Sequence, residues 1–352
     1  MNDDNIVRVG LIGAGWIGSH HGRNVIANPY AELAAVADAE QSRAEAFLTC
    51  EGIGGRAYDD YHELLEQPDI DAVVIATPNG MHARQAIAAA EAGKHIYLEK
   101  PMAITLDDCR AVAQAVATAG VICDMGYHRR LNPLVQYAKG LQGEGKLGDL
   151  VLAESDYMHY IPGDWDIWSW LGKEEIAGSL IHAGAGHNID LLRYFAGEVA
   201  EVQCFKDIRM PRKIQVETED IAIINLRFES GVLGRAMFIS GPILPFTFTL
   251  RLYGTAGTVF DNRVWLNTIP CFDQPGHEGD SITLPKSWIP DNVQGGISET
   301  WDKCINAFID DVRLQRKPFN GAASGFNTAA VCFAAVQAAQ EKKVIAPETM
   351  PV

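Results

Sequence analysis

The feature that most constrains the fold of this chain is a glycine-rich turn near its amino terminus. An apolar, branched run, Ile6 to Ile12, predicts a buried strand, which breaks into Gly13-x-Gly15-x-x-Gly18 before a helix-compatible segment, Ser19 to Ala27. In a dinucleotide site the first glycine allows a tight turn, the second lets the backbone approach a pyrophosphate, and the third lets helix and strand pack closely. The N–H groups at the helix start face the phosphates. The residues expected to bind the dinucleotide here are Gly13, Ala14, Gly15, Trp16, Ile17 and Gly18.

An acidic residue after the next strand supports this interpretation, because three glycines are weak evidence in a chain that contains 33. A second strand, Ala31 to Ala37, ends in Asp38, whose carboxylate is placed to accept hydrogen bonds from the adenosine ribose. Asp38 would repel a 2′-phosphate and Ala39 offers it no donor, which favours NAD over NADP, although Arg43 could reach that region. The alternative is a glycine-rich turn in some other α/β protein.

Strands and helices alternate through the first third of the chain, which predicts a doubly wound parallel sheet covered by helices on both faces. Further short strands are expected at Ala72 to Ala76, His95 to Leu98 and Val121 to Cys123. Ligands bind beyond the carboxyl ends of such strands. The residues that follow the strands should therefore converge on one crevice, namely Gly13, Asp38, Thr77, Pro78, Asn79, Glu99, Lys100 and Pro101.

The pattern changes near residues 124 to 130, and we expect a first domain over 1–124 and a second over 125–352. A strand is predicted at Leu150 to His159, followed by an aromatic-rich loop, Tyr160 to Trp170, and a glycine-rich helical segment, Ala177 to Phe195. Consecutive strands without helices between them predict an antiparallel sheet. These strands are Val202 to Phe205, Thr218 to Phe228, Val232 to Ser240, Phe246 to Tyr253 and Thr258 to Phe260.

The end of the chain is predicted to combine an irregular stretch with helices. Arg263 to Ser298 contains four prolines and is expected to be irregular, and two helices, Glu299 to Leu314 and Ala323 to Lys342, follow it. No apolar run approaches the length of a membrane span on inspection of the sequence.

Charge and cysteine usage limit the possible partners and the compartment. The formal net charge of −16 argues against nucleic acid or an anionic membrane as a partner. Seven scattered cysteines lack a paired or metal-like spacing, so we expect reduced thiols. The amino terminus lacks the regions of a signal peptide. A cytoplasmic protein is expected.

Two motifs narrow the function, Glu99-Lys100-Pro101 and His187-Asn188-Ile189-Asp190. Together with the glycine turn, Asp38, Thr77-Pro78-Asn79 and His82, they make the chain resemble the Gfo/Idh/MocA family, the glucose–fructose oxidoreductase and inositol dehydrogenase group, over nearly its whole length. The resemblance implies an N-terminal Rossmann domain and a C-terminal α+β domain with a large, mostly antiparallel open sheet. It also implies hydride transfer between a nicotinamide cofactor and a hydroxyl-bearing carbon of a sugar, sugar derivative or inositol.

The same resemblance assigns roles to individual residues. Oxidising an alcohol requires a base for the hydroxyl proton and a cation to favour the developing alkoxide. Lys100 is expected to orient the hydroxyl and stabilise negative charge, and His187 to accept the proton, since an imidazole titrates near neutral pH. Asp190 lies on the same helical face as His187 and could bind a substrate hydroxyl or support the histidine. The remaining cofactor contacts are expected from Thr77, Pro78, Asn79, His82, Glu99 and Lys100.

One departure from the family pattern concerns the position four residues before His187. The family usually has an aspartate there, and this chain has Ala183. The segment reads as the family motif with one residue inserted and His182 in place of the aspartate. His182 could share the acid–base role, line the pocket or be structural. His182 and His187, five residues apart, could suggest a metal site, but the sequence shows no third ligand. No metal is therefore expected.

The rest of the substrate pocket is predicted from loops and strand ends. Tyr127, His128 and Arg130 follow the last strand of the first domain, and Tyr157, His159, Trp165 and Trp168 precede the His187 helix. Aromatic faces stack against a sugar ring while polar groups bind its hydroxyls. Alternative substrates are a non-sugar cyclic diol or an amino sugar, and the alternative function is a non-catalytic nucleotide-binding sensor. The open second sheet predicts a homodimer or homotetramer.

Overall fold

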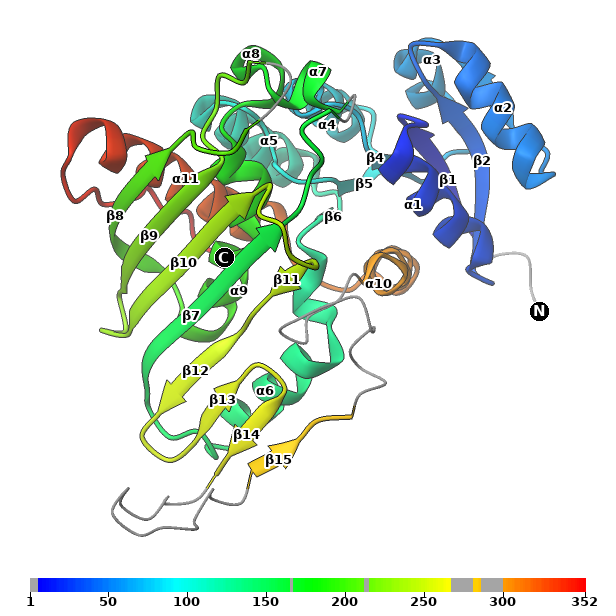
Figure 1. Cartoon of the computed structure of the whole chain (residues 1–352). Helices are drawn as coiled ribbons and strands as arrows, with labels where there is room; N and C mark the ends of the chain where they lie inside the picture. The colour runs from blue at the N-terminus through cyan, green and yellow to red at the C-terminus, as the bar shows by residue number, and fades with distance from the viewer. Residues whose placement is uncertain (1–5, 165–166, 212–214, 267–280, 286–299) are drawn as a thin grey trace, which may run out of the picture.

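A computed structural model describes residues 6–164, 167–211, 215–266, 281–285 and 300–352. It has an N-terminal domain built on a parallel sheet and a C-terminal domain built on a larger sheet, which lies beside it (Figure 1). The expected fold class is confirmed.

The first sheet has six parallel strands in the order β3-β2-β1-β4-β5-β6. Chain order reverses between β1 and β4, and a crevice opens at such a switch point in doubly wound sheets. The central strands are almost entirely buried, since helices cover both faces. The strands are β1 (Val7–Ile12), β2 (Ala31–Ala37), β3 (Arg56–Tyr58), β4 (Ala72–Ile75), β5 (His95–Leu98) and β6 (Cys123–Met125).

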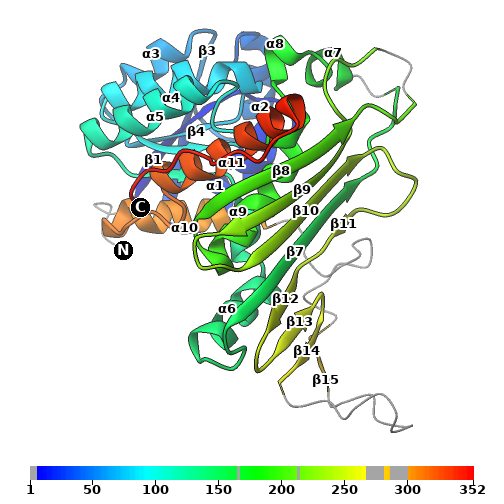
Figure 2. The ribbon, with the colours of Figure 1, turned by 90° about the vertical axis from the view of Figure 1, so that its left-hand side faces the viewer.

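Two groups of helices cover this sheet. Its helices are α1 (Trp16–Ala27), α2 (Gln41–Glu51), α3 (Tyr61–Leu65), α4 (His82–Glu91) and α5 (Leu106–Ala119), with a 3-10 turn, η2 (Asn79–Met81), before α4. On one face α3, α4 and α5 share a core with the first half of α11 (Ala322–Glu341). On the other face α1 and α2 share a core with α10 (Trp301–Leu314). The chain therefore returns to the first domain near its end, which a division at residue 124 does not anticipate (Figure 2).

The second sheet has nine strands in the order β15-β14-β13-β12-β7-β10-β9-β8, with β11 beside β7. Its pairings are antiparallel except between β10 and β7, which run parallel. One face packs against α6 (Pro133–Gly143), α9 (Gly186–Ala196) and α11, and the other face is open (Figure 2). The strands are β7 (Leu150–His159), β8 (Val199–Asp207), β9 (Ile221–Phe228), β10 (Leu233–Ser240), β11 (Thr247–Phe248), β12 (Arg251–Gly254), β13 (Thr258–Phe260), β14 (Arg263–Trp265) and β15 (Ser281–Thr283).

Tertiary contacts move several predicted boundaries. The strand expected over Phe246 to Tyr253 is two strands, β11 and β12, because the Thr249 hydroxyl accepts the Asp156 N–H at 2.8 Å and interrupts the ladder. Strand β6 extends to Met125, whose N–H donates to the Asn320 carbonyl. The stretch expected to be irregular contains β14 and β15, which are too short to show alternation, and its remaining residues 267–280 and 286–298 lie outside the described part.

Short helices occupy the segment expected to be an aromatic loop and the start of one long helix. These are α7 (Trp168–Leu171) and α8 (Glu174–Ala177), followed by a π-helical turn, η4 (Ile181–Ala185), which leads directly into α9. A 3-10 turn, η3 (His128–Leu131), joins β6 to α6. The π-turn contains one more residue per hydrogen-bonded ring than an α-helix, which fits the inserted residue inferred from the sequence.

Helix α11 has the length and hydropathy of a membrane span, with a mean hydropathy of 1.2, contrary to the expectation from inspection of the sequence. In the structure 72% of that window is buried, and the helix packs against β8, α9 and α5. This is the environment of a core helix that joins the two domains.

Candidate active site

The glycine turn after β1 has the geometry that a dinucleotide requires. Gly13 has a φ of +96°, a conformation that L side chains rarely adopt, and its N–H donates to the Ala37 carbonyl at 2.8 Å. A Cβ on Gly18 would lie 1.9 Å from the Gly13 carbonyl oxygen, so only glycine allows this close packing. A Cβ on Gly15 would meet no atom within 4 Å. Gly15 therefore borders open space that a pyrophosphate could enter.

The start of α1 is suited to binding an anion. Its first turn contains no acidic residue, and no side chain caps its N–H groups. Trp16, the first residue of the helix, is 64% exposed, and Ile17 follows it. Because the N–H groups and the helix dipole face the same space as Gly15, the turn fits the phosphates of a dinucleotide.

Asp38 lies at the carboxyl end of β2, directly beside the glycine turn. Its carboxylate accepts N–H groups from Ala14 at 2.9 Å and from Glu40 at 3.0 Å. Arg43, which could have reached a 2′-phosphate, is 2.6 Å from the Glu40 carboxylate and 3.9 Å from that of Asp38. The Arg43 guanidinium is thus paired with two carboxylates rather than free to bind a 2′-phosphate. The residues present therefore fit NAD.

The loop after β4 is fixed to the loop after β5 by His82, which is fully buried. Its Nδ1 lies 2.6 Å from the Pro101 carbonyl oxygen, and its Nε2 lies 2.9 Å from the Thr77 carbonyl oxygen. Burial lowers the pKa of His82. Next to Pro78, the Asn79 amide donates to the Ala177 carbonyl at 2.8 Å and joins this loop to the second domain. These polar side chains hold the loops in place.

Glu99 holds the backbone of Lys100. One carboxylate oxygen lies 2.8 Å from His21 Nε2, and the other accepts the Lys100 N–H at 3.0 Å. Burial favours the neutral acid, but the bond from His21 and the charges of His21, Lys100 and His128 together lower the pKa of Glu99 to about 2. The charged carboxylate of Glu99 therefore holds the main chain of Lys100 in place.

The Lys100 side chain spans the distance between the two domains. Its Nζ donates to the Ala183 carbonyl in the π-turn, at 3.4 Å. Ala183 lies four residues before His187, about one helical turn. The charge of Lys100 also acts on His187, whose pKa is held well below its ordinary value by burial, then by Lys100, His128 and Arg129. The ammonium and the imidazole therefore belong to one site.

Aromatic rings surround His187 and extend to the glycine turn. Tyr157 stacks on His187 with a centroid distance of 6.2 Å, and His128 lies edge-on at 5.1 Å. From His128 the series continues to Trp301 at 6.1 Å and from Trp301 to Trp16 at 5.2 Å. The turn that fits the phosphates and the histidine of the second domain are thus connected by ring contacts.

Comparison with known protein families agrees with this geometry. Residues 7–127 match the oxidoreductase family with an NAD-binding Rossmann fold, and residues 135–260 match the GFO/IDH/MocA C-terminal domain. The scyllo-inositol 2-dehydrogenase (NAD(+)) of Bacillus subtilis strain 168 is 31% identical over 261 residues, which cover 72% of this chain and 73% of the relative. This chain belongs to the Gfo/Idh/MocA family.

Further relatives and solved structures agree with this assignment. The levoglucosan dehydrogenase of Pseudarthrobacter phenanthrenivorans is 30% identical over 321 residues, 78% of each chain. A solved structure of levoglucosan dehydrogenase in complex with NADH and levoglucosan has a TM-score of 0.85 and 26% identity, and covers 98% of this chain and 100% of that one. This Gfo/Idh/MocA member is an NAD-binding oxidoreductase.

Two residues predicted to contact substrate, Arg130 and Asp190, pair with each other. Arg130 donates to the Asp190 carboxylate through Nε at 2.8 Å and Nη2 at 2.6 Å. Asn320 and Thr328 each donate to the same carboxylate at 3.2 Å, and Asp190 has no exposed surface. Asp190 and His187 both lie within the described residues 167–211, and no hydrogen bond joins them. This family member therefore presents Asp190 and Arg130 as a buried pair that joins α9 to α11 and η3.

His182 is a buried residue of the π-turn itself. Its ring lies 4.0 Å from that of Phe333, and neither ring nitrogen has a hydrogen-bond partner in the described structure. Burial lowers its pKa to about 4, so the imidazole is neutral near pH 7. The structure places Ala183, rather than His182, against Lys100.

The other predicted lining residues have mixed environments. Tyr127 is buried with its ring 5.9 Å from that of His187, and the Tyr157 hydroxyl lies 3.2 Å from His159 Nδ1. The Trp168 indole donates to the Pro162 carbonyl at 2.8 Å inside the core. Trp165 lies outside the described residues.

Several neighbours of the site were not anticipated. His21, Trp301 and the Ala183 carbonyl approach it through long-range contacts. For His21 a signal existed, because its spacing from Gly18 and Val25 places it on the buried face of α1.

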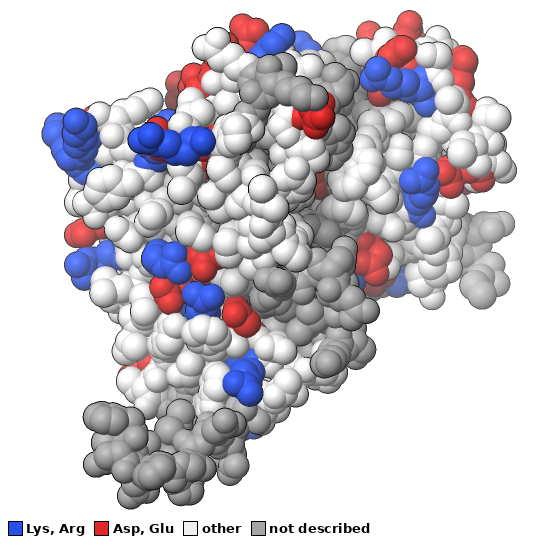
Figure 3. Space-filling view, in the orientation of Figure 1, with Lys and Arg blue, Asp and Glu red and all other residues white. Residues whose placement is uncertain are grey.

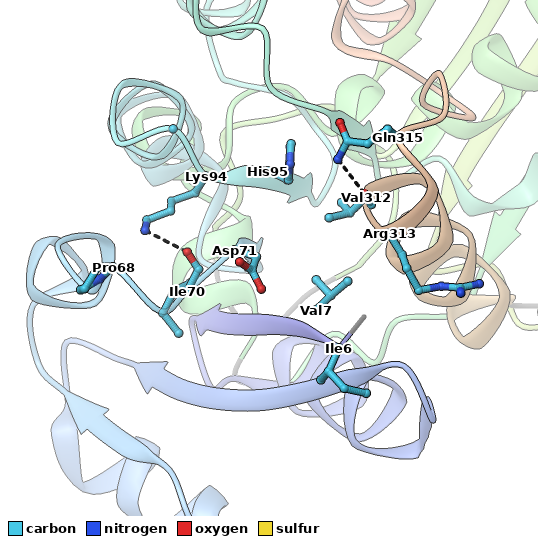
Figure 4. A pocket seen from close by; sticks show the side chains of 11 residues that line it. Ile6, Val7, Pro68, Ile70, Asp71, Lys94, His95, Val312, Arg313 and Gln315 are labelled. Atoms are coloured by element: carbon cyan, nitrogen blue, oxygen red, sulfur yellow. Dashed lines mark hydrogen bonds between the residues drawn. The ribbon is translucent and has the colours of Figure 1, made fainter. Parts of the chain in front are cut away.

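The described residues contain no metal cluster, and the cavity found among them lies away from the site. Among the described residues no group of three or more His, Cys, Asp or Glu could hold a metal ion. A cavity of about 410 Å³ lies at the opposite, amino-terminal ends of β1, β4 and β5 (Figure 4). Its Lys94 ammonium is bonded to the Gln67 and Ile70 carbonyls. The site is therefore identified by its residues, namely the glycine turn, Lys100 and His187.

Proposed function

We propose that this oxidoreductase is an NAD-dependent dehydrogenase that oxidises a hydroxyl-bearing carbon of a sugar, sugar derivative or inositol. The observation that carries the proposal is the contact of Lys100 with the turn that precedes His187, on the side of the first sheet where Gly15 and Asp38 lie. The named relatives, among them inositol and levoglucosan dehydrogenases, support the substrate class.

In the proposed reaction the C–H bond and the O–H bond of one substrate carbon both break, and that carbon becomes a carbonyl. When bound, NAD supplies the carbon that accepts the hydride. His187 takes the hydroxyl proton, and the Lys100 ammonium stabilises the negative charge that develops on the oxygen. Burial and the nearby cations lower the pKa of His187, which favours the neutral imidazole that a proton acceptor needs and also makes it a weaker base than a free imidazole.

The surrounding residues have supporting roles in this proposal. Glu99, with His21, fixes the backbone of Lys100, and His82 fixes the following residue, Pro101. Asp190 supports α9 through Arg130 rather than contacting substrate. Tyr157 stacks on both His187 and Phe238, and its ring would hold the imidazole in place.

A substrate panel tests the function. NADH formation is measured at 340 nm with myo-inositol, scyllo-inositol, levoglucosan, hexoses, an amino sugar and a non-sugar cyclic diol. Turnover with a sugar or inositol supports the proposal, and turnover only with the amino sugar or the diol would transfer the function to those alternatives. Tight NAD binding without turnover of any compound would favour the sensor.

We also propose that the protein is a homo-oligomer through its second sheet. The open face of that sheet exposes large apolar side chains from neighbouring strands, and Phe205 is 67% exposed. The exposed apolar residues are Val151, Phe205, Ile223 and Leu233. Charged side chains of both signs also gather over this sheet (Figure 3). On neighbouring strands, Arg235 pairs with Glu154 and Asp156. A monomer in light scattering at micromolar concentration would contradict this proposal.

A further inference from the structure

The π-turn η4 connects the proposed base to the Lys100 ammonium, and it ends where α9 begins. Its central residue, Ala183, accepts the hydrogen bond from Lys100 Nζ, and Gly186 closes the wide turn by donating to the Ile181 carbonyl. His187 follows immediately. A displacement of this turn would move the acceptor of Lys100 and the base together.

Glu219 holds the start of the π-turn. One of its carboxylate oxygens accepts the Ile181 N–H at 2.9 Å and the Ser179 hydroxyl, and the other lies 2.9 Å from Lys206 Nζ. The side chain is only 4% exposed. Burial favours the neutral acid, but the bonds from Ser179 and Lys206 lower the pKa of Glu219. A charged carboxylate therefore satisfies free donors at the start of a helical segment, where negative charge is favourable.

The turn is confined on its other sides by aromatic rings. A Cβ on Gly184 would lie 2.1 Å from the Phe238 ring on β10, and the Phe333 ring of α11 lies against His182. Because neither His182 nitrogen is hydrogen-bonded, that side chain adds packing but no polar anchor. The polar attachment of the turn's start falls to Glu219, together with the Ser179 hydroxyl that donates to it and itself accepts the Ile181 N–H at 3.2 Å.

We propose that Glu219 is a positioning residue: it fixes the π-turn Ile181–Ala185 and thereby fixes the Ala183 carbonyl that orients the Lys100 ammonium. A main-chain carbonyl then performs the orienting role at a position where the family pattern has an aspartate side chain. This inference rests on the proposed function for its catalytic consequence, but its structural part can be measured without turnover.

The test compares Glu219→Gln and Glu219→Ala with a matched control, Glu198→Gln. Glu198 follows α9 and pairs with Arg193 near the carboxyl end of that helix, so the control removes a carboxylate that contacts α9 without reaching the π-turn. Glu219→Gln keeps the size of the side chain while it places an amide opposite Lys206, and it covers the case in which Glu219→Ala fails to fold.

Two readouts are recorded on the full-length protein. The first is steady-state kinetics, in which we expect kcat to fall roughly tenfold, since small misplacements of reacting groups are costly, with the Kd for NAD unchanged. The second is the labelling rate of Lys100 by acetic anhydride, followed by peptide mass spectrometry. Lys100 should react severalfold faster in the Glu219 variants, while Lys94, bonded to two carbonyls far from the turn, should keep its rate.

The outcomes separate the two proposals. Wild-type kcat together with wild-type Lys100 labelling in a folded Glu219 variant would overturn the positioning role. Faster labelling of Lys94 and Lys100 alike would also overturn it, because it indicates general loosening. Selective labelling of Lys100 in a protein that oxidises no substrate would sustain the positioning role and reject the proposed function.

Discussion

The N–H of Ala14 in the glycine turn donates a 2.9 Å hydrogen bond to the carboxylate of Asp38 at the end of the neighbouring strand. The acid proposed to bind the adenosine ribose is thus also part of the turn that faces the phosphates. The Ala14 N–H holds the Asp38 carboxylate toward this crevice.

Replacing Asp38 should change the choice of cofactor. Asp38→Asn keeps an oxygen for the Ala14 N–H but removes the charge that repels a 2′-phosphate, so we expect NAD to bind roughly tenfold more weakly and NADP to bind more tightly. Titration of both cofactors measures this. Glu45→Gln, at an exposed position of α2, is the control, and an unchanged preference in Asp38→Asn would exclude a ribose contact.

Alanine at two glycines of one motif should have different consequences. Gly18→Ala would place a Cβ 1.9 Å from the Gly13 carbonyl oxygen and should prevent stable folding. Gly15→Ala meets no protein atom within 4 Å, so the thermal midpoint should stay near that of the wild type while NAD binding is lost. Differential scanning calorimetry with and without NAD distinguishes them. Normal NAD affinity in Gly15→Ala would place the pyrophosphate elsewhere.

Lys100→Ala and His187→Ala should each lower kcat by roughly a hundredfold or more, the scale of a lost acid–base or charge-stabilising group. NAD affinity should change much less, because neither group is proposed to hold the nucleotide phosphates. Lys303→Ala, at an exposed position of α10, serves as the control. Activity retained in both site variants would refute their proposed roles.

Asp190→Ala should mainly affect stability. Breaking the buried pair leaves the Arg130 charge uncompensated, which typically costs about 3 to 5 kcal/mol of the free energy of unfolding. KM for the substrate should stay within a few-fold of the wild-type value in the folded enzyme. Urea unfolding and steady-state kinetics measure the two effects; a large rise in KM at unchanged stability would instead indicate a substrate contact.

His182 should make the protein less stable in mild acid. Its pKa is about 4 when folded and has an ordinary value of 6.5. The unfolded chain therefore binds the extra proton first, and stability falls as the pH drops from about 6.5 toward 4, by on the order of 3 kcal/mol. His182→Phe keeps an aromatic ring against Phe333 and should remove this loss.

The comparison with wild type is needed because other buried groups titrate in the same range. The pKa of Asp124 is raised to about 7, chiefly by burial, and contributes with the opposite sign. If the pH dependence of the free energy of unfolding is the same in both proteins, His182 is not a buried neutral imidazole.

Local sequence patterns predicted the first domain well and the site in part. β2 has the predicted bounds, Ala31–Ala37, because a short apolar run between turn residues defines a buried parallel strand. Lys100 and Asp38 were predicted to lie at the crevice because strand ends carry ligand-binding residues, and the role of Lys100 came from the family resemblance. The pairing of Asp190 with Arg130 could not be read from their spacing, because it depends on how α9 packs against η3.

The same limit applies to Glu219 and Trp301. Both residues reach the site from elements that are distant in the sequence. The sequence around each one shows no pattern that predicts which residue it contacts. Tertiary packing alone brings a glutamate before β9 under the π-turn and a tryptophan at the start of α10 against Trp16.

The return of α10 to the nucleotide-binding half has a consequence for synthesis on the ribosome. Ile305, Phe308 and Ile309 complete the core on one face of the first sheet, and they are translated long after the strands they pack against, among them β1 and β5. Until then the nascent domain exposes apolar surface. The first domain can complete its packing only after the C-terminal residues have been translated. The cofactor-binding half and the end of the chain therefore finish folding together.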